Sequence, residues 1–260
     1  MYYRLAMDGT CTARVGGGKR AALGALMLGF AWAVPSTAFA SASLQISPVL
    51  LEVPAGGAAS NVTIANQDSR PADIQVRLFK WTQADGEETL TPTEDVVASP
   101  PIATIQPHSK LTVRVIRVAT GEVASEEAYR LVIDQLPQSD AGGRAIVSML
   151  VRQVLPLFFE PAERASADVA WSLARTPRGW ALRARNSGDR RMRIAKVVLS
   201  GGGAPVAMGG GLLGYALAHS EMSWTLPARG AHFSPGGRVS LGGDSDVGAL
   251  HATATVSAGE

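Results

Sequence analysis

The chain has 260 residues, of which 46% are hydrophobic and 18% are charged. A disordered chain contains fewer apolar residues and more charge, so this composition excludes a wholly disordered protein. The 28 Gly and 15 Pro follow no fixed period, which excludes a fibrous repeat, and the formal net charge is only +2.

Residues 1–42 have the features of a secretory signal peptide. Basic residues, the last of them Arg20, precede an apolar run at 21–34 that ends at Pro35. Small residues then offer a cleavage site after Ala40 or Ala42. The apolar run is shorter than the roughly 20 residues of a membrane-spanning helix. We therefore expect export and cleavage rather than an uncleaved anchor.

Removal of this segment changes the charge and the redox chemistry. It leaves 20 basic and 21 acidic residues, so no basic surplus favours nucleic-acid binding. Cys11, the only cysteine, leaves with the segment. The mature protein therefore has no disulfide, no cysteine nucleophile and no thiolate metal site. No later run approaches 18 apolar residues, and we expect the mature chain not to span a membrane.

From residue 44 onward, short runs of alternating apolar residues recur between clusters of Gly, Pro, Asn and Asp. This pattern predicts an all-β sandwich, and helical periodicity is nearly absent. Asp85-Gly86 is typical of a hairpin tip, which we expect to lie in solvent. The expected strands are 44–53, 59–66, 73–82, 110–118, 129–135, 145–159, 169–175, 180–186, 193–200, 214–218, 221–226, 238–241 and 251–256.

The predicted strand at 145–159 is unusually long and apolar. A typical strand has about 5–6 residues. Val147, Met149 and Val151 would share one face, and the other face is also apolar at its start. At a sheet edge such a surface would promote aggregation unless a partner covered it. The alternative is a central strand that its own domain covers on both sides.

The chain divides after this strand. Residues 160–164 (EPAER) resemble a linker, and the following part is richer in Gly and Arg. We expect an N-terminal domain over 43–162 and a smaller C-terminal β-sandwich over 163–260, both of ordinary domain size.

Residues for catalysis are not apparent. The four His have no metal-ligand spacing, and the sequence contains no HExxH or GxSxG motif. Residues 209–214 fit GxGxxG, but they follow no strong strand and open no helix. We therefore expect no catalytic residues, no cofactor and no metal, and a binding protein rather than an enzyme.

A series of segments spread over most of the mature chain carries a resemblance to a known family. In order, the segments are 43–57 (SLQISPVLLEVPAGG), 62–67 (VTIANQ), 74–81 (IQVRLFKW), 99–115 (SPPIATIQPHSKLTVRV), 126–137 (EEAYRLVIDQLP), 154–161 (VLPLFFEP) and 214–227 (GYALAHSEMSWTLP). Together they resemble the periplasmic chaperones of chaperone–usher fimbrial biogenesis. The resemblance implies two immunoglobulin-like sandwiches arranged as an L. It also implies a chaperone that binds pilus subunits and passes them to an outer-membrane usher.

In this family, the last strand of the first domain lends alternate apolar residues to a subunit that lacks a strand. This donor-strand complementation is a form of strand addition to a sheet edge. The resemblance assigns the donated residues to Val147, Met149 and Val151. When no subunit is bound, such a face should be covered, either by self-association of the chaperone or by another part of the same chain.

The resemblance also implies a carboxylate anchor for the subunit. In the best-studied branch a basic pair holds the subunit's C-terminal carboxylate, but the matching positions here are Leu50 and Pro156. The segments 79–81 (FKW), 126–131 (EEAYRL) and 154–159 (VLPLFF) resemble the archaic branch. There the anchoring arginine lies in the YRL motif, which assigns the role to Arg130.

The sequence also allows other cations as the carboxylate anchor, other partners for Arg130 and other functions for the chain. Lys80, between two aromatic residues, is a second candidate that could point into the same cleft. Further candidates are Arg114, Arg117 and Arg152. Instead of an anchor, Arg130 could form a salt bridge with Glu126 or Glu127. At the level of function, the alternatives are a secreted pilus subunit or adhesin, and a non-catalytic periplasmic β-sandwich binding protein.

Overall fold

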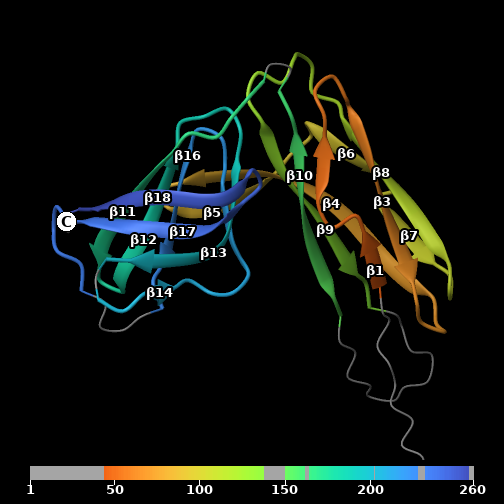
Figure 1. The fold of residues 1–260 in the computed structure, drawn as a ribbon. Coiled ribbons are helices and arrows are strands. Elements are labelled where there is room, and N and C mark those ends of the chain that lie inside the picture. Colours follow the sequence, from red (N-terminus) through yellow and green to blue (C-terminus); the bar gives the residue numbers. More distant parts are fainter. Residues whose placement is uncertain (1–43, 138–149, 162–163, 202, 228–231, 258–260) are drawn as a thin grey trace, which may run out of the picture. The chain divides into compact units, whose positions relative to one another are not determined.

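The computed structural model describes residues 44–137, 150–161, 164–201, 203–227 and 232–257. All regular structure in these ranges is β-strand, arranged in three sheets (Figure 1). The all-β prediction is therefore confirmed. Within the same ranges, no helix is long and apolar enough to cross a membrane. The predicted signal peptide, Val147 and Met149 lie outside the described residues.

Two sheets are built from the strands between residues 44 and 159. The first sheet has four strands in the order β1 (Leu44–Ser47), β3 (Ala59–Asn66), β8 (Lys110–Arg117) and β6 (Val96–Ser99). The second sheet has the order β2 (Leu51–Val53), β10 (Arg152–Phe159), β9 (Glu127–Gln135), β4 (Ala72–Ala84) and β5 (Glu87–Pro92), with β7 (Ile102–Ile105) also paired to β4.

The third sheet is built from the strands between residues 169 and 256. The predicted boundary near residue 162 lies between the two sets of strands, and the division into two domains stays a prediction. The order is β14 (Val206–Ala207), β13 (Met192–Ser200), β17 (Arg238–Ser245), β18 (Gly248–Val256), β11 (Val169–Thr176), β12 (Gly179–Asn186) and β16 (Ser220–Thr225), with β15 (Leu212–Ala216) paired to β13.

The first two sheets enclose one apolar core between them. Alternate residues of each strand point into it, as the pleat requires. On β9 these residues are Tyr129, Leu131 and Ile133, all fully buried. On β10 they are the odd-numbered Leu155, Leu157 and Phe159. The opposite face of the second sheet, called the outer face below, carries the even-numbered residues of both strands.

The outer face has its own apolar cluster, which joins the second and third sheets. Trp81 of β4 and Phe158 of β10 pack against Tyr215 of β15, with ring centroids 5.6–5.9 Å apart. Ala128, Leu217 and the half-buried Leu50 complete this aromatic cluster. Beside it, the buried side chain of Gln83 binds the Tyr215 carbonyl at 2.9 Å and accepts hydrogen bonds from the Leu217 N–H and the Ser220 hydroxyl.

Strand β10 has one fully paired edge and one partly open edge. It pairs antiparallel with β9 from Arg152 to Phe159, and the two strands lie side by side in Figure 1. On its other side it pairs with β2 only over Leu157–Phe159. Among the described residues, 152–156 therefore have no strand on that side. The strand starts at Arg152, so the expected strand at residues 150 and 151 is not formed.

The hairpin between β4 and β5 turns at Asp85 and Gly86, as predicted, with positive φ at both residues. The expectation that its tip is solvated is wrong at Gly86, which is buried. The Gly86 carbonyl accepts a hydrogen bond from the Ser223 N–H at 3.2 Å. The hairpin tip is thus docked on β16.

We predict that Gly86→Ala destabilises the protein more than Gly121→Ala. Both residues have positive φ, which costs a residue with a side chain about 1–2 kcal/mol. A Cβ at Gly86 would lie 2.4 Å from Ser223 Oγ, whereas nothing lies within 4 Å of one at Gly121. Overpacking adds about 1–3 kcal/mol. Urea unfolding of the two variants measures the difference, and equal losses would mean that the hairpin tip is not docked.

Candidate functional site

Arg130 lies on the outer face of the second sheet, next to the aromatic cluster. Its guanidinium carbon is 3.5 Å from the centroid of the Trp81 ring. Its Nη2 lies 3.5 Å from Glu88 Oε2 on β5. The Arg130 side chain is 16% exposed and that of Glu88 is 39% exposed. Burial lowers the pKa of Arg130 and Glu88 opposes this shift, but an arginine remains charged in proteins.

The partners suggested for Arg130 by the sequence are wrong. Glu126 binds Arg191 instead, and Glu127 binds Arg117 through two hydrogen bonds of 2.8 and 2.9 Å. Glu88 was not anticipated, because its closeness to Arg130 depends on the pairing of the β4–β5 hairpin with β9, which is far from it in the sequence.

Pro156 and Leu50, which occupy the positions of the basic pair in the resemblance, both lie near Arg130. Pro156 is directly opposite Arg130 in the pairing of β10 with β9. Leu50 packs against the aromatic cluster that contains Trp81. Arg130 on the neighbouring strand β9 therefore places a cation close to Pro156 and Leu50, the two positions that have no basic residue here.

The hydrogen-bond pattern of β10 shows which backbone groups face the open edge. The Gln135 N–H donates to the Val151 carbonyl at 3.0 Å, so odd-numbered residues of β10 bond to β9. The Glu160 N–H donates to the Val53 carbonyl at 2.9 Å, so even-numbered residues face the other way. The open edge therefore offers the N–H groups of Arg152 and Val154. It offers none at Pro156, which has no N–H.

Lys80 does not share a site with Arg130. It is directly opposite Tyr129 in the pairing of β4 with β9, whereas Arg130 is opposite Phe79. Cross-strand partners lie on one face, so Lys80 and Arg130 point to opposite faces of the sheet. Lys80 Nζ donates to the Tyr129 hydroxyl at 3.2 Å. The expectation that Lys80 points into the same cleft as Arg130 is wrong.

The hydroxyl that Lys80 contacts is buried. Burial raises the pKa of Tyr129, so its hydroxyl stays protonated. It donates to Glu127 Oε2 at 3.0 Å. The hydrogen bond from Arg117 lowers the pKa of Glu127, although burial opposes this. Lys80 thus belongs to a hydrogen-bonded series of side chains, Lys80–Tyr129–Glu127–Arg117, within the protein's own structure.

Arg152 lies on the outer face with Arg130, but at the far end of the strand pair. Its partner Asp134 is four residues from Arg130 along β9, or ~13 Å. Asp134 binds Arg152 at 2.5 Å and Arg77 at 2.6 Å. Burial acts to raise the pKa of Asp134, but the hydrogen bonds from the two arginines together lower it. Val151, half-buried, lines a cavity of about 530 Å³ beside this triad.

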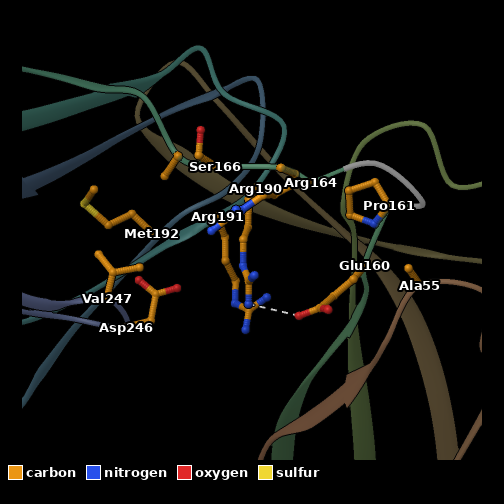
Figure 2. Close-up of a pocket in the computed structure, with 12 residues that line it drawn as sticks. Ala55, Glu160, Pro161, Arg164, Ser166, Arg190, Arg191, Met192, Asp246 and Val247 are labelled. Carbon is orange, nitrogen blue, oxygen red and sulfur yellow. Dashed lines mark hydrogen bonds and ion pairs between the residues drawn. The ribbon is translucent and has the colours of Figure 1, made fainter.

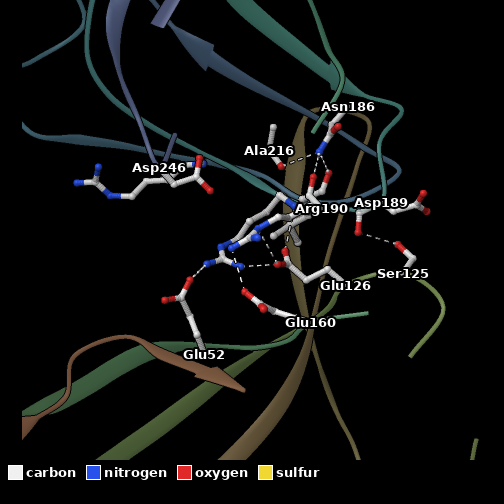
Figure 3. A network of polar contacts seen from close by, with 12 residues as sticks. Glu52, Ser125, Glu126, Glu160, Asn186, Asp189, Arg190, Ala216 and Asp246 are labelled. Carbon is white, nitrogen blue, oxygen red and sulfur yellow. Dashed lines mark hydrogen bonds and ion pairs between the residues drawn. The ribbon is translucent and has the colours of Figure 1, made fainter. Parts of the chain in front are cut away.

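A second polar group, missed by the sequence reasoning, links the second and third sheets (Figure 3). Arg191 is 2% exposed and bonds to both Glu126 and Glu52. Its guanidinium also stacks on Phe158 at 3.7 Å. Burial raises the pKa of Glu126 and the charge of Arg191 opposes this. The adjacent charges were visible in the sequence, but nothing local indicates which of them are buried.

A cavity of about 640 Å³ borders this network (Figure 2). Arg190 and Glu160 both line it and form an ion pair of 2.9 Å. Arg164 and Asp246 add one further charge of each sign. The described residues hold no group of three or more His, Asp or Glu placed to bind a metal. Arg191 also lines the cavity, whose lining therefore carries three arginines and two carboxylates.

Part of the chain matches a known protein family, and most of it matches solved structures in fold. Residues 43–165 match the family described as "Pili and flagellar-assembly chaperone, PapD N-terminal domain". No curated protein matches the sequence. Structural likeness extends over most of the chain.

Three solved structures illustrate this likeness. A chain of the CsuC–CsuE chaperone–tip adhesion subunit complex from archaic Csu pili of Acinetobacter baumannii has a TM-score of 0.65 at 22% identity, covering 83% of this chain and 100% of that one. The E. coli chaperone DraB has a TM-score of 0.54 at 17% identity, covering 82% and 97%. A chain of the Salmonella enterica SafA pilin–SafB chaperone complex has a TM-score of 0.56 at 17% identity, covering 81% and 95%. These matches confirm the immunoglobulin-like β fold.

We predict that Glu126→Ala destabilises the protein far more than Asp134→Ala. The first change leaves the buried Arg191 without its main partner, and breaking a buried ion pair costs about 3–5 kcal/mol. The second change frees Arg77 and Arg152, whose side chains are 41% and 63% exposed. Exposed pairs contribute about 0–1 kcal/mol. Urea unfolding of both variants checks the order, and a reversed order would contradict the assigned burial.

Proposed function

We propose that this chain, whose residues 43–165 match the pili and flagellar-assembly chaperone family, is a periplasmic chaperone for pilus subunits. It binds subunits by donor-strand complementation and delivers them to an outer-membrane usher. The sequence features of a signal peptide at 1–42 support export to the periplasm. The family is one of non-catalytic chaperones, and the function needs neither a catalytic residue nor a cofactor.

The observation that carries this proposal is the open edge of β10. The N–H groups of Arg152 and Val154 face that edge, next to the short pairing with β2. An exposed row of unpaired backbone groups is a template for an added strand. A subunit that lacks a strand of its own can pair there through its backbone.

The donated side chains follow from the same alternation. Val151, just before β10, continues the odd-numbered alternation of Leu155, which points into the core. In the sequence, Val147 and Met149 continue this alternation. A subunit strand that pairs with the open edge would extend its sheet onto β10, and these apolar side chains would fill the subunit's groove.

The anchor follows from the end of the open edge. Hydrogen bonding along the edge stops at Pro156, so a paired subunit strand would end there. Pro156 is the residue of β10 that lies directly opposite Arg130 on β9. A guanidinium can bind a terminal carboxylate with two parallel hydrogen bonds. Trp81 supports the flat face of this guanidinium at 3.5 Å. Arg130 is therefore our choice for the anchor, and Lys80 is not, because it points to the opposite face.

The similar structures support this reading. Two of them hold a chaperone together with a tip subunit or a pilin. Identity to the archaic Csu complex is 22%, compared with 17% for DraB and for the SafA–SafB complex, which agrees with the archaic branch. A pilus subunit or adhesin is not favoured, because the matching family is one of chaperones. Usher binding and self-association of the free protein stay predictions.

We predict that Arg130→Ala abolishes recovery of the subunit from the periplasm with little loss of chaperone stability. Loss of one partner of a buried charge pair at an interface costs about 2–5 kcal/mol of binding, or roughly 30- to several-thousand-fold in affinity. Arg175→Ala is the matched control, since Arg175 also lies over a tryptophan, Trp180, but in the third sheet. Affinity purification with mass spectrometry, beside thermal melts, measures both effects. Normal recovery with Arg130→Ala would move the anchor elsewhere, with Arg152 tested next.

We predict that Met149→Glu prevents subunit capture while the chaperone still folds. A glutamate would carry an unpaired charge into an apolar groove, which is strongly unfavourable. Met149→Leu keeps the volume and apolar character and should capture normally. Subunit recovery and circular dichroism of the two variants decide the matter. An unfolded Met149→Glu variant would show that Met149 belongs to the chaperone's own core.

A further inference from the structure

We propose that Glu88 is an internal placeholder for the subunit's carboxylate: it occupies Arg130 in the free protein and competes with the incoming carboxylate. This inference rests on the proposed role of Arg130 as the anchor. It goes beyond that role by naming the group that an arriving subunit must displace.

The pairing of β5 with β4 places Glu88 on the same face as Arg130. Glu88 is directly opposite Gln83, and Leu90 is opposite Trp81. Since Trp81 and Gln83 point to the outer face, Glu88 does so as well. Glu87, one residue earlier, is opposite Ala84 and points to the other face. The two adjacent glutamates thus occupy opposite faces of the sheet, so Glu87 serves as an internal control for Glu88.

The ion pair between Glu88 and Arg130 is weak enough to be exchanged. A single contact of 3.5 Å joins them, at the long limit for a hydrogen bond. A bidentate carboxylate would use two contacts of about 2.7–2.9 Å. The Glu88 side chain is 39% exposed, so it can move into water when displaced. An incoming terminal carboxylate therefore has the stronger geometry available to it.

The backbone of Glu88 is held in place while its side chain is free to leave. The tip of the β4–β5 hairpin is docked on β16 through the Gly86 carbonyl. The Gln83 side chain adds three hydrogen bonds to residues 215–220. Release of Arg130 thus requires a rotamer change of Glu88 and no movement of the hairpin.

The test uses a small probe that carries only the group in question. The mature protein is titrated with N-acetylglycine, which ends in a carboxylate, and with N-acetylglycinamide, which is its uncharged match. The readout is the NMR signal of the Arg130 Nε–H, assigned by its loss in Arg130→Lys.

We expect N-acetylglycine alone to shift this signal. In Glu88→Gln, the Kd for N-acetylglycine should fall about 2- to 5-fold, because a partly exposed competing charge has been removed. Glu87→Gln should leave it unchanged.

The possible results distinguish the role of Glu88 as a competitor from the role of Arg130 as the anchor. Weaker binding in Glu88→Gln would make Glu88 an orienting residue and overturn the competition. Unchanged binding in Glu88→Gln, together with loss of subunit recovery in Arg130→Ala, would overturn the inference on Glu88 and leave the anchor intact. An Arg130 signal that responds to neither probe in any variant would overturn the anchor and the placeholder together.

Discussion

The pairing of β10 with β9 determines where the other parts of the site lie. It places the odd-numbered side chains of β10 in the core and the even-numbered ones on the outer face. It also directs the backbone groups of Arg152 and Val154 to the open edge and brings Pro156 opposite Arg130. A shift by one residue would exchange all of these assignments. The fully buried side chains of Leu155, Leu157 and Phe159 hold the pairing in this register.

The outer face of the second sheet is as constrained as its inner face. Along β4 the buried positions change from Ile74 and Val76 on the core side to Trp81 and Gln83 on the outer side. The same strand therefore supports the apolar core at one end and the aromatic cluster at the other. This change of face provides the flat ring on which Arg130 rests, and it fixes the hairpin that carries Glu88. Arg130 is held by the largely buried strand β9, whereas Glu88 lies on the exposed strand β5.

The sequence predicted most of the strands, because half-buried strands alternate visibly between apolar and polar residues. It missed β5, β6, β7 and the two-residue β14; β5 is exposed along its whole length and has no such alternation. The face of Arg130 followed from the alternation of β9. Its contact with Glu88 and the opposite face of Lys80 did not, because they depend on the register of β4 with its neighbours. The ion pair of Glu126 with Arg191 was equally hidden, since no local pattern marks a charge as buried.

The surroundings of Arg130 bear on what an anchor contributes to binding. A mostly buried guanidinium is unfavourable without an anion nearby, and in the free protein Glu88 provides one. Binding of a subunit carboxylate would then replace one ion pair by another instead of creating a new one. The gain in free energy from such an exchange is the difference between a long single contact and a bidentate pair. Most of the affinity would therefore come from strand pairing and apolar burial along β10. The arginine would chiefly select a chain end that carries a carboxylate and fix its register against Pro156.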